Sequence, residues 1–309
     1  MSLFSRLLDA TSFGSPLLRT IAPSVAAAFA LQTAAAIPSV ALQTEHYYDL
    51  SGTLTYIAVG ALSLCLPALR ARALGLAVAS PNWRQVVLTG AATIWAARLG
   101  SYLFQRVRSE GKDSRFDAIR HSPSKFATAF VGQAAWVSLC LMPILAVNSI
   151  PAAALSAALP RLLATDVLGL GLWVGGFAVE VVADRQKSRW VRARRAKEHD
   201  EAFMTRGLFG RSRFPNYFGE MTLWTGMAIT AAGVLARRPV QLALGLSGGA
   251  AGILVTTSLA FVSPAFSALL LLKVSGVPMS EAKYDERYGH RGDYQEWKRN
   301  TPRLVPKLW

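Results

Sequence analysis

The sequence predicts an all-α fold, namely a polytopic membrane bundle of about seven transmembrane helices with a cytosolic C-terminal segment. Two observations carry this prediction. Of the 309 residues, 52% are hydrophobic and only 17% are charged, whereas soluble domains carry about 25% charged residues. The apolar residues also gather into runs long enough to cross a hydrocarbon core of about 30 Å. Because backbone polar groups in a bilayer must be satisfied internally, we expect these runs to be helices.

Seven apolar runs are the predicted spans, and a polar N-terminal arm of residues 1–23 precedes them. The arm contains neither a cleavage motif nor the apolar segment of a secretory signal. The runs cover residues 24–42, 53–69, 85–104, 126–147, 162–183, 218–236 and 240–272. The last run is too long for one straight span and contains Pro264, so one crossing and two crossings both stay open.

The chain has a formal charge of +15, and most of its basic residues lie between the predicted spans or after the last one. Cytoplasmic loops collect lysine and arginine, and most of the 33 basic residues fall in 105–125, 184–217 and 273–309. With seven spans these segments share one side, so we expect them and the C-terminus to be cytosolic. A nucleic-acid partner would need a basic soluble module with stacking aromatic residues, and the sequence offers none.

Cysteine and histidine predict neither a metal centre nor a disulfide. Cys65 and Cys140 lie in separate apolar runs, and the four histidines occupy four different polar segments. Neither pattern has the spacing of a metal site or of a disulfide framework.

Arg98 lies inside the third predicted span, and Tyr102 and Arg106 follow it at spacings of four on the same helical face. An arginine at this depth either extends along the helix to the headgroups or lines a polar cavity inside the bundle.

Glu180 and Asp184 share a helical face at the cytosolic end of the fifth predicted span. Acids at a helix C-terminus oppose the helix dipole, so helix stability explains the pair poorly. The basic residues that follow either neutralise the pair or join it in binding a ligand with hydroxyl and phosphate groups. These basic residues are Arg185, Lys187, Arg189 and Arg192.

The segment that begins at Ser212 predicts a helix whose start is also a polar site. Ser212 is a candidate cap, and Pro215 suits the first helical turn. Asn216, Glu220 and Trp224 follow at spacings of four, so an amide, a carboxylate and a flat ring share one face. This set suits an aromatic ring that bears an amide better than it suits lipid.

The C-terminal segment, residues 273–309, is dense in aromatic and charged side chains, and its Tyr284, Arg287 and Tyr288 share a helical face. Such residues either form an aromatic belt at the membrane surface or close over a ligand on the cytosolic side.

Taken together, these motifs resemble the steroid 5-alpha-reductase superfamily, most closely its bacterial and fungal branch. The resemblance covers residues 85–309, which leaves residues 24–84 as additional N-terminal membrane helices. It rests on the order and spacing of Arg98…Arg106, 111–117, Glu180/Asp184, Arg213-Phe-Pro-Asn-Tyr-Phe-Gly-Glu220, Ser275-Gly-Val-Pro278 and Glu281…Tyr294.

The resemblance implies an integral membrane oxidoreductase that uses NADPH from the cytosol. Its reaction would be reduction of a carbon–carbon double bond conjugated to a ketone in a sterol-like or other lipid taken from the bilayer. The membrane would be the endoplasmic reticulum in a eukaryote and the inner membrane in a bacterium. The cofactor-binding residues implied are Arg98, Asp184, Arg185, Arg189, Arg192, Arg213, Asn216, Tyr217, Glu220, Trp224, Tyr284, Arg287 and Tyr288.

Within that set, the resemblance places Asn216 and Glu220 at the nicotinamide, and Asp184 with its arginines at the adenosine and phosphates. One departure concerns the proton donor. Enone reduction needs an acid that supports the developing enolate oxygen, and Trp95 stands where the family carries a tyrosine. Tyr102 is the hydroxyl that we nominate as the catalytic acid.

Two other functions stay open. Isoprenylcysteine-type methyltransferases, which use S-adenosylmethionine, have a similar basic helix start and a tail rich in glutamate and tyrosine. A lipid-binding protein without catalysis would explain Trp95, although it would not need a cofactor site.

Overall fold

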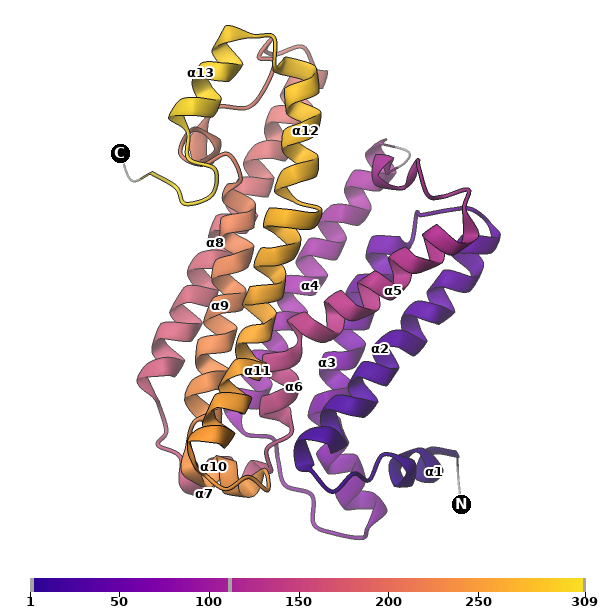
Figure 1. The fold of residues 1–309 in the computed structure, drawn as a ribbon, viewed down its shortest axis with the longest axis vertical. Helices are drawn as coiled ribbons and strands as arrows, with labels where there is room; N and C mark the ends of the chain where they lie inside the picture. Colours follow the sequence, from indigo (N-terminus) through magenta and orange to yellow (C-terminus); the bar gives the residue numbers. More distant parts are fainter. Residues whose placement is uncertain (1–2, 111–112, 308–309) are drawn as a thin grey trace. The chain divides into compact units, whose positions relative to one another are not determined.

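The computed structural model describes residues 3–110 and 113–307, and these residues form helices and no strand (Figure 1). The elements are α1 (Leu3–Ala10), α2 (Pro16–Ala41), α3 (Tyr48–Ala73), α4 (Trp83–Glu110), η1 (Ser114–Phe116), α5 (Pro123–Cys140), α6 (Met142–Asn148), α7 (Ala152–Ala158), α8 (Ala164–Arg195), η2 (Gly207–Gly210), α9 (Pro215–Leu235), α10 (Arg238–Ala243), α11 (Ala250–Leu269), the π-helical turn η3 (Leu270–Val274), α12 (Val277–Tyr288) and α13 (Gly292–Asn300). The all-α prediction is confirmed for this part of the chain. Gly111 and Lys112, which belong to one motif of the family resemblance, lie outside the described residues.

Within the described ranges, five helices are long and apolar enough to cross a membrane, and one bent pair raises the number to six. The five are α2, α3, α4, α8 and the stretch Ala250–Tyr288, and the bent pair is α5 with α6, which meet at 53°. Several of the described helices could therefore span a membrane, which is consistent with the predicted multi-pass membrane protein. The number seven is not confirmed, and the orientation in the membrane stays a prediction.

The predicted span 218–236 forms α9, which does not belong to the apolar set. Polar side chains near its start, among them Asn216 and Glu220, lower its mean hydropathy. The helix therefore forms where it was expected, but its composition alone does not identify it as a crossing.

The predicted span 240–272 resolves into the short α10, a loop, and one helix that begins at Ala250. Gly245 and Gly248 adopt positive φ in the loop, a conformation that glycine reaches without strain. Pro264 lies inside α11 without ending it. This region thus supplies one candidate crossing and not two.

The chain divides into two compact units. Unit 1 comprises the residues up to Leu163 together with Ala231–Ser263, and unit 2 comprises Ala164–Thr230 and Pro264–Trp309.

In unit 1, α3 packs against α2 and α4, and α2 packs against α5 (Figure 1). Aromatic rings of α3, α4 and α5 pack together. The ring centroid of Tyr56 on α3 lies 5.3 Å from that of Trp95 on α4 and 4.9 Å from that of Trp136 on α5. A neutral hydrogen bond also joins two helices, because Asn148 Nδ2 donates to Ser63 Oγ at 2.8 Å. Such bonds between helices are typical of membrane bundles.

In unit 2, α8 and α9 approach so closely that only glycine fits between them. A Cβ atom on Gly176 would lie 2.5 Å from the carbonyl oxygen of Gly219, and a Cβ on Gly219 would lie 2.7 Å from the backbone nitrogen of Glu180. Small residues of this kind let membrane helices pack backbone to backbone. The contact fixes the start of α9 beside the middle of α8.

The C-terminal part of unit 2 folds back on the segment between α8 and α9. The backbone N–H of Arg213 donates to Pro302 O at 2.9 Å, and that of Lys307 donates to Arg211 O at 3.0 Å. Phe203 from this segment packs with Tyr288 and Tyr294 in a buried aromatic cluster. The tail is therefore an ordered part of the unit.

Candidate functional site

A pocket in unit 2 lies where α8, α9, α12 and α13 meet the segment that joins α8 to α9. Four residues that the sequence predicts as cofactor ligands line it, namely Arg213, Asn216, Tyr217 and Tyr284. The remaining lining residues are Lys187, Met204, Phe209, Phe214, Ser280, Glu281, Tyr294 and Trp297. Cationic, amide and aromatic groups thus share one small space.

The start of α9 forms one wall of this pocket. Pro215 is the first helical residue, as predicted. Ser212 is buried, and its hydroxyl accepts from the backbone N–H of Phe214 at 3.2 Å and donates to Leu304 O at 2.7 Å. Ser212 therefore holds the turn before the helix and the tail, and does not cap the first helical turn. The rings of Phe214 and Tyr217 stack at 5.5 Å.

Glu281 on α12 determines the charge beside the pocket. Its Oε1 accepts from Arg213 Nη1 at 2.6 Å, and its Oε2 accepts from Arg303 Nη2 at 2.6 Å. One carboxylate thus orients two guanidinium groups, while Lys187 adds a third cation to the lining. The balance of these groups is positive, which favours an anionic ligand.

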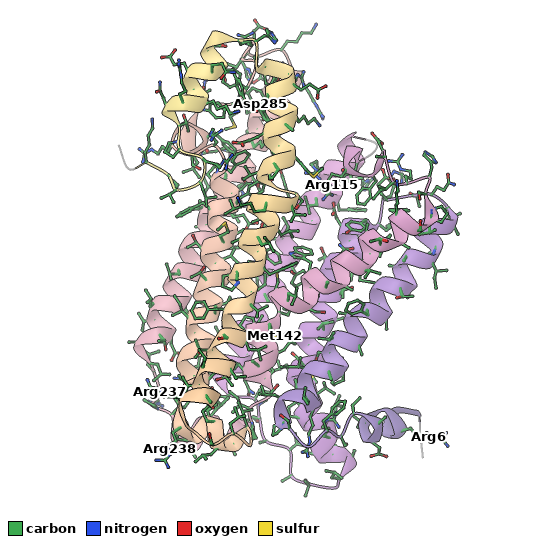
Figure 2. All side chains as sticks on the ribbon, viewed as in Figure 1. Arg6, Arg115, Met142, Arg237, Arg238 and Asp285 are labelled. Carbon is green, nitrogen blue, oxygen red and sulfur yellow. The ribbon has the colours of Figure 1, made fainter. Side chains whose placement is uncertain are left out.

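Helix α13 closes the pocket with Tyr294 and Trp297. Tyr294 is buried, and its hydroxyl donates to Asp285 at 2.8 Å. Lys298 also reaches Asp285, at 2.6 Å, and Figure 2 shows this carboxylate on α12. Burial and the hydrogen bond to Asp285 raise the pKa of Tyr294 well above its usual value, so the phenol stays protonated. Its role here is to hold α13.

The acid and arginine group of α8 lies outside the pocket lining. Asp184 and Glu180 are buried, at 4% and 2% exposure, whereas the three arginines that follow are exposed. Those arginines are Arg185, Arg189 and Arg192. Lys187, on the same helix, is the member of this basic run that reaches the pocket.

Four more predicted residues, two on α9 and two on α12, lie outside the pocket lining. Deeper along α9, Glu220 is half-buried and Trp224 is fully buried. On α12, Tyr288 belongs to the buried aromatic cluster, and the exposed Arg287 guanidinium lies 5.4 Å from its ring centroid. None of these four residues lines the pocket.

Arg98 and Tyr102 lie on α4 in unit 1, where the Arg98 guanidinium is 5.5 Å from the Tyr102 ring centroid. Both side chains are half-buried. Trp95, one turn earlier, is completely buried between Tyr56 and Trp136. Tyr56 on α3 is therefore a buried phenol beside Trp95, and no pattern in the sequence indicated that residues of α3 and α4 pair here.

Several pocket residues escaped the sequence-based assignment. Glu281 and Tyr294 stood in the motifs behind the resemblance, but only as motif residues. Tyr284 and Tyr288 are four residues apart, and Tyr294 and Trp297 on the next helix are three apart. Each spacing places two rings on one helical face, which is the signal that could have indicated two aromatic faces packed together. Lys187 belongs to a run of basic residues, and its spacing did not distinguish it from the others.

Within residues 3–110 and 113–307, no group of three histidine, cysteine, aspartate or glutamate side chains is arranged to hold a metal ion. The comparisons with known proteins add one finding. A sequence model of DUF1295, described as "Protein of unknown function (DUF1295)", matches residues 39–247 and 244–301, which is most of the chain. No curated protein and no solved structure matches. The chain belongs to the DUF1295 family.

Proposed function

We propose that this protein is an integral membrane oxidoreductase that binds NADPH and reduces a carbon–carbon double bond conjugated to a carbonyl group in a sterol-like or other lipid. The observation that carries the proposal is the lining of the pocket in unit 2. It combines cations, a primary amide and ring faces, which are the groups that bind the phosphates, the carboxamide and the aromatic rings of a dinucleotide.

The lining residues divide among the parts of such a ligand. Arg213 and Lys187 suit phosphate oxygens, since guanidinium and ammonium groups form strong charge-assisted hydrogen bonds. The first turn of α9 adds backbone N–H groups and the positive end of a helix dipole. Asn216 can both donate to and accept from a carboxamide. Tyr217 and Tyr284 offer ring faces for stacking.

The resemblance to steroid 5-alpha-reductases supplies the reaction, in which bound NADPH provides a hydride. This chain must then provide an acid for the developing enolate oxygen. Tyr102 is our candidate, because a phenol can donate a proton and the Arg98 guanidinium lies 5.5 Å from its ring centroid.

Ligand binding by the purified protein tests the proposal. A ligand that binds only the folded state raises the melting temperature, so NADPH should stabilise the protein and S-adenosylmethionine should not. Asn216→Ala should remove most of the stabilisation. Absence of any response to NADPH would overturn the cofactor assignment.

A membrane methyltransferase is the second candidate, and the environment of Trp95 favours it. This indole is buried among aromatic rings and supplies no acid, and methyl transfer does not need the enolate-stabilising proton donor. Stabilisation by S-adenosylmethionine alone would move the assignment to this reaction. A response to neither ligand would favour a lipid-binding protein without catalysis.

A further inference from the structure

Unit 1 carries a second hollow, a groove lined by residues of α2 and α5, two helices that lie side by side in Figure 1. Its rim is apolar and open, since Phe29, Ile37 and Val131 are 38%, 67% and 54% exposed. Gln32 is the buried polar residue in its lining.

The surroundings of this groove are those of a bilayer. Helix α2 meets the criteria for a membrane span, and α5 forms a bent span with α6. The groove extends along α2 from Phe29 to Ala41, which is about 18 Å of helix at 1.5 Å per residue. This length exceeds half of a hydrocarbon core of about 30 Å. At this depth of a bilayer, an apolar groove is occupied by a lipid chain and not by water.

A polar cluster adjoins the groove at Gln32, and its other members, among them Ser51 and Gln133, do not belong to the lining. Gln32 Nε2 donates to Thr55 Oγ1 at 2.7 Å, while its Oε1 receives only a long contact of 3.5 Å from Ser51 Oγ. On α5, Gln133 Nε2 donates to Tyr48 O at 3.2 Å, and Ser51 Oγ donates to the same carbonyl at 2.7 Å. The two amides therefore meet one short stretch of α3.

This cluster has unused acceptors. Gln133 is 4% exposed, and its Oε1 receives no hydrogen bond from the described residues. Rotating the amide does not help, because it would place the oxygen against the carbonyl oxygen of Tyr48. An acceptor buried without a donor is costly. Together with the weak contact to Gln32 Oε1, it favours a ligand that brings a hydrogen-bond donor.

We propose that the α2–α5 groove binds a single-chain lipid that carries a hydroxyl group. The apolar chain of the lipid lies along the groove, and its single hydroxyl hydrogen is donated to the amide oxygen of either Gln32 or Gln133. This proposal requires that the protein lies in a membrane, and it does not require the reductase function.

Photolabelling of the full-length protein tests this site. The probe is hexadecanol with a diazirine in its chain, and mass spectrometry maps the labelled residues. We expect labelling at residues 29–41 and 127–134, and we expect unlabelled hexadecanol to compete at least tenfold better than hexadecane. Labels spread evenly over the membrane helices, or equal competition by hexadecane, would overturn the proposal.

Variants separate the groove from its polar end. Thr33→Trp places a large side chain in the groove and should lower labelling at least tenfold, whereas Ala34→Trp, at an exposed neighbour outside the lining, should not. Gln32→Met should remove the roughly tenfold preference for the alcohol, as expected for loss of one hydrogen bond. Gln133→Met gives the same test should the first variant not fold. Unchanged labelling in a folded Thr33→Trp protein would contradict the assignment.

Discussion

In unit 1, Arg115 bridges two carboxylates, Asp49 and Asp113, at 2.8 and 2.5 Å, whereas in unit 2 one carboxylate, Glu281, bridges two arginines. We name the first group the loop cluster, which comprises Glu45, Asp49, Arg106, Asp113, Arg115, Asp117 and Arg120. We name the second the pocket cluster, which comprises Lys187, Arg213, Glu281 and Arg303.

The two clusters differ in the balance of their charges. The loop cluster holds four acids and three arginines, and Figure 2 shows Arg115 among the side chains beyond the end of α4. The pocket cluster holds three cations and one acid, next to a pocket. Ion pairs that balance one another serve structure, while an excess of one sign beside a cavity indicates a ligand of the other sign.

Removal of Arg213 should give the largest effect. We expect Arg213→Ala to weaken NADPH binding by about 100-fold, because a hydrogen bond between charged groups contributes about 1.5–3 kcal/mol. Isothermal titration would measure it, with Arg211→Ala as the control, since Arg211 is exposed and lies outside the pocket lining. Equal affinities for the two variants would remove Arg213 from the site.

Removal of Arg115 should reduce stability and leave ligand binding intact. Asp113 then loses its closest partner at a nearly buried site, but the Arg115 side chain is 40% exposed. Solvent screening limits the loss to about 1–2 kcal/mol. Thermal unfolding of Arg115→Leu would show it, with the exposed Arg108→Leu as the control. A loss of NADPH binding without a loss of stability would contradict the structural role.

Tyr294→Phe tests the contact that holds α13 against α12 in unit 2. It deletes the hydrogen bond to Asp285 while Lys298 still reaches that carboxylate, so we expect a loss of about 1 kcal/mol. Hydrogen exchange should increase in α13 and not in α3. Tyr47→Phe, at an exposed position, is the matched control.

Acid should weaken the loop cluster by a smaller amount. Burial alone would raise the pKa of Asp113, but the hydrogen bonds and charge of Arg115, together with Arg106, outweigh burial and lower this pKa. Because the folded-state pKa lies below the unfolded value of about 3.9, the stabilisation is present above that pH and is lost as the pH falls through the folded-state pKa. Asp113→Asn should flatten this acid limb of the melting temperature, and Asp9→Asn should not.

Much of the fold was predictable because apolar run length is a direct readout of membrane thickness. The runs behind α2, α3, α4 and α8 each gave one helix of the expected type. Run length did not predict the bend between α5 and α6, because one apolar run continues through it; the signal was Pro143, which lies in the first turn of α6 and interrupts the helical hydrogen bonds. The helix α9 forms where it was predicted, but its composition does not meet the criteria for a membrane span. The residues that make its start a candidate site also make it less apolar.

The candidate site was partly predictable. Arg213, Asn216 and Tyr217 stand within five residues, so local spacing placed them together. The contribution of α13 depends on how the chain returns, which spacing along one helix does not contain. Arg287 and Tyr288 were expected on one face, but consecutive helical residues point about 100° apart, and packing buries Tyr288 and leaves Arg287 exposed.

The hydrogen bonds from Ser212 to Leu304 and from Lys307 to Arg211 have a practical consequence for anyone who handles this protein. They tie the last described residues to the turn that leads into α9. An affinity tag or fluorescent fusion placed directly after residue 309 would therefore begin a few residues from this turn. It would disturb the start of α9, which forms one wall of the pocket. A weak ligand response from a C-terminally tagged sample would be uninformative, and purification through an N-terminal tag avoids the problem.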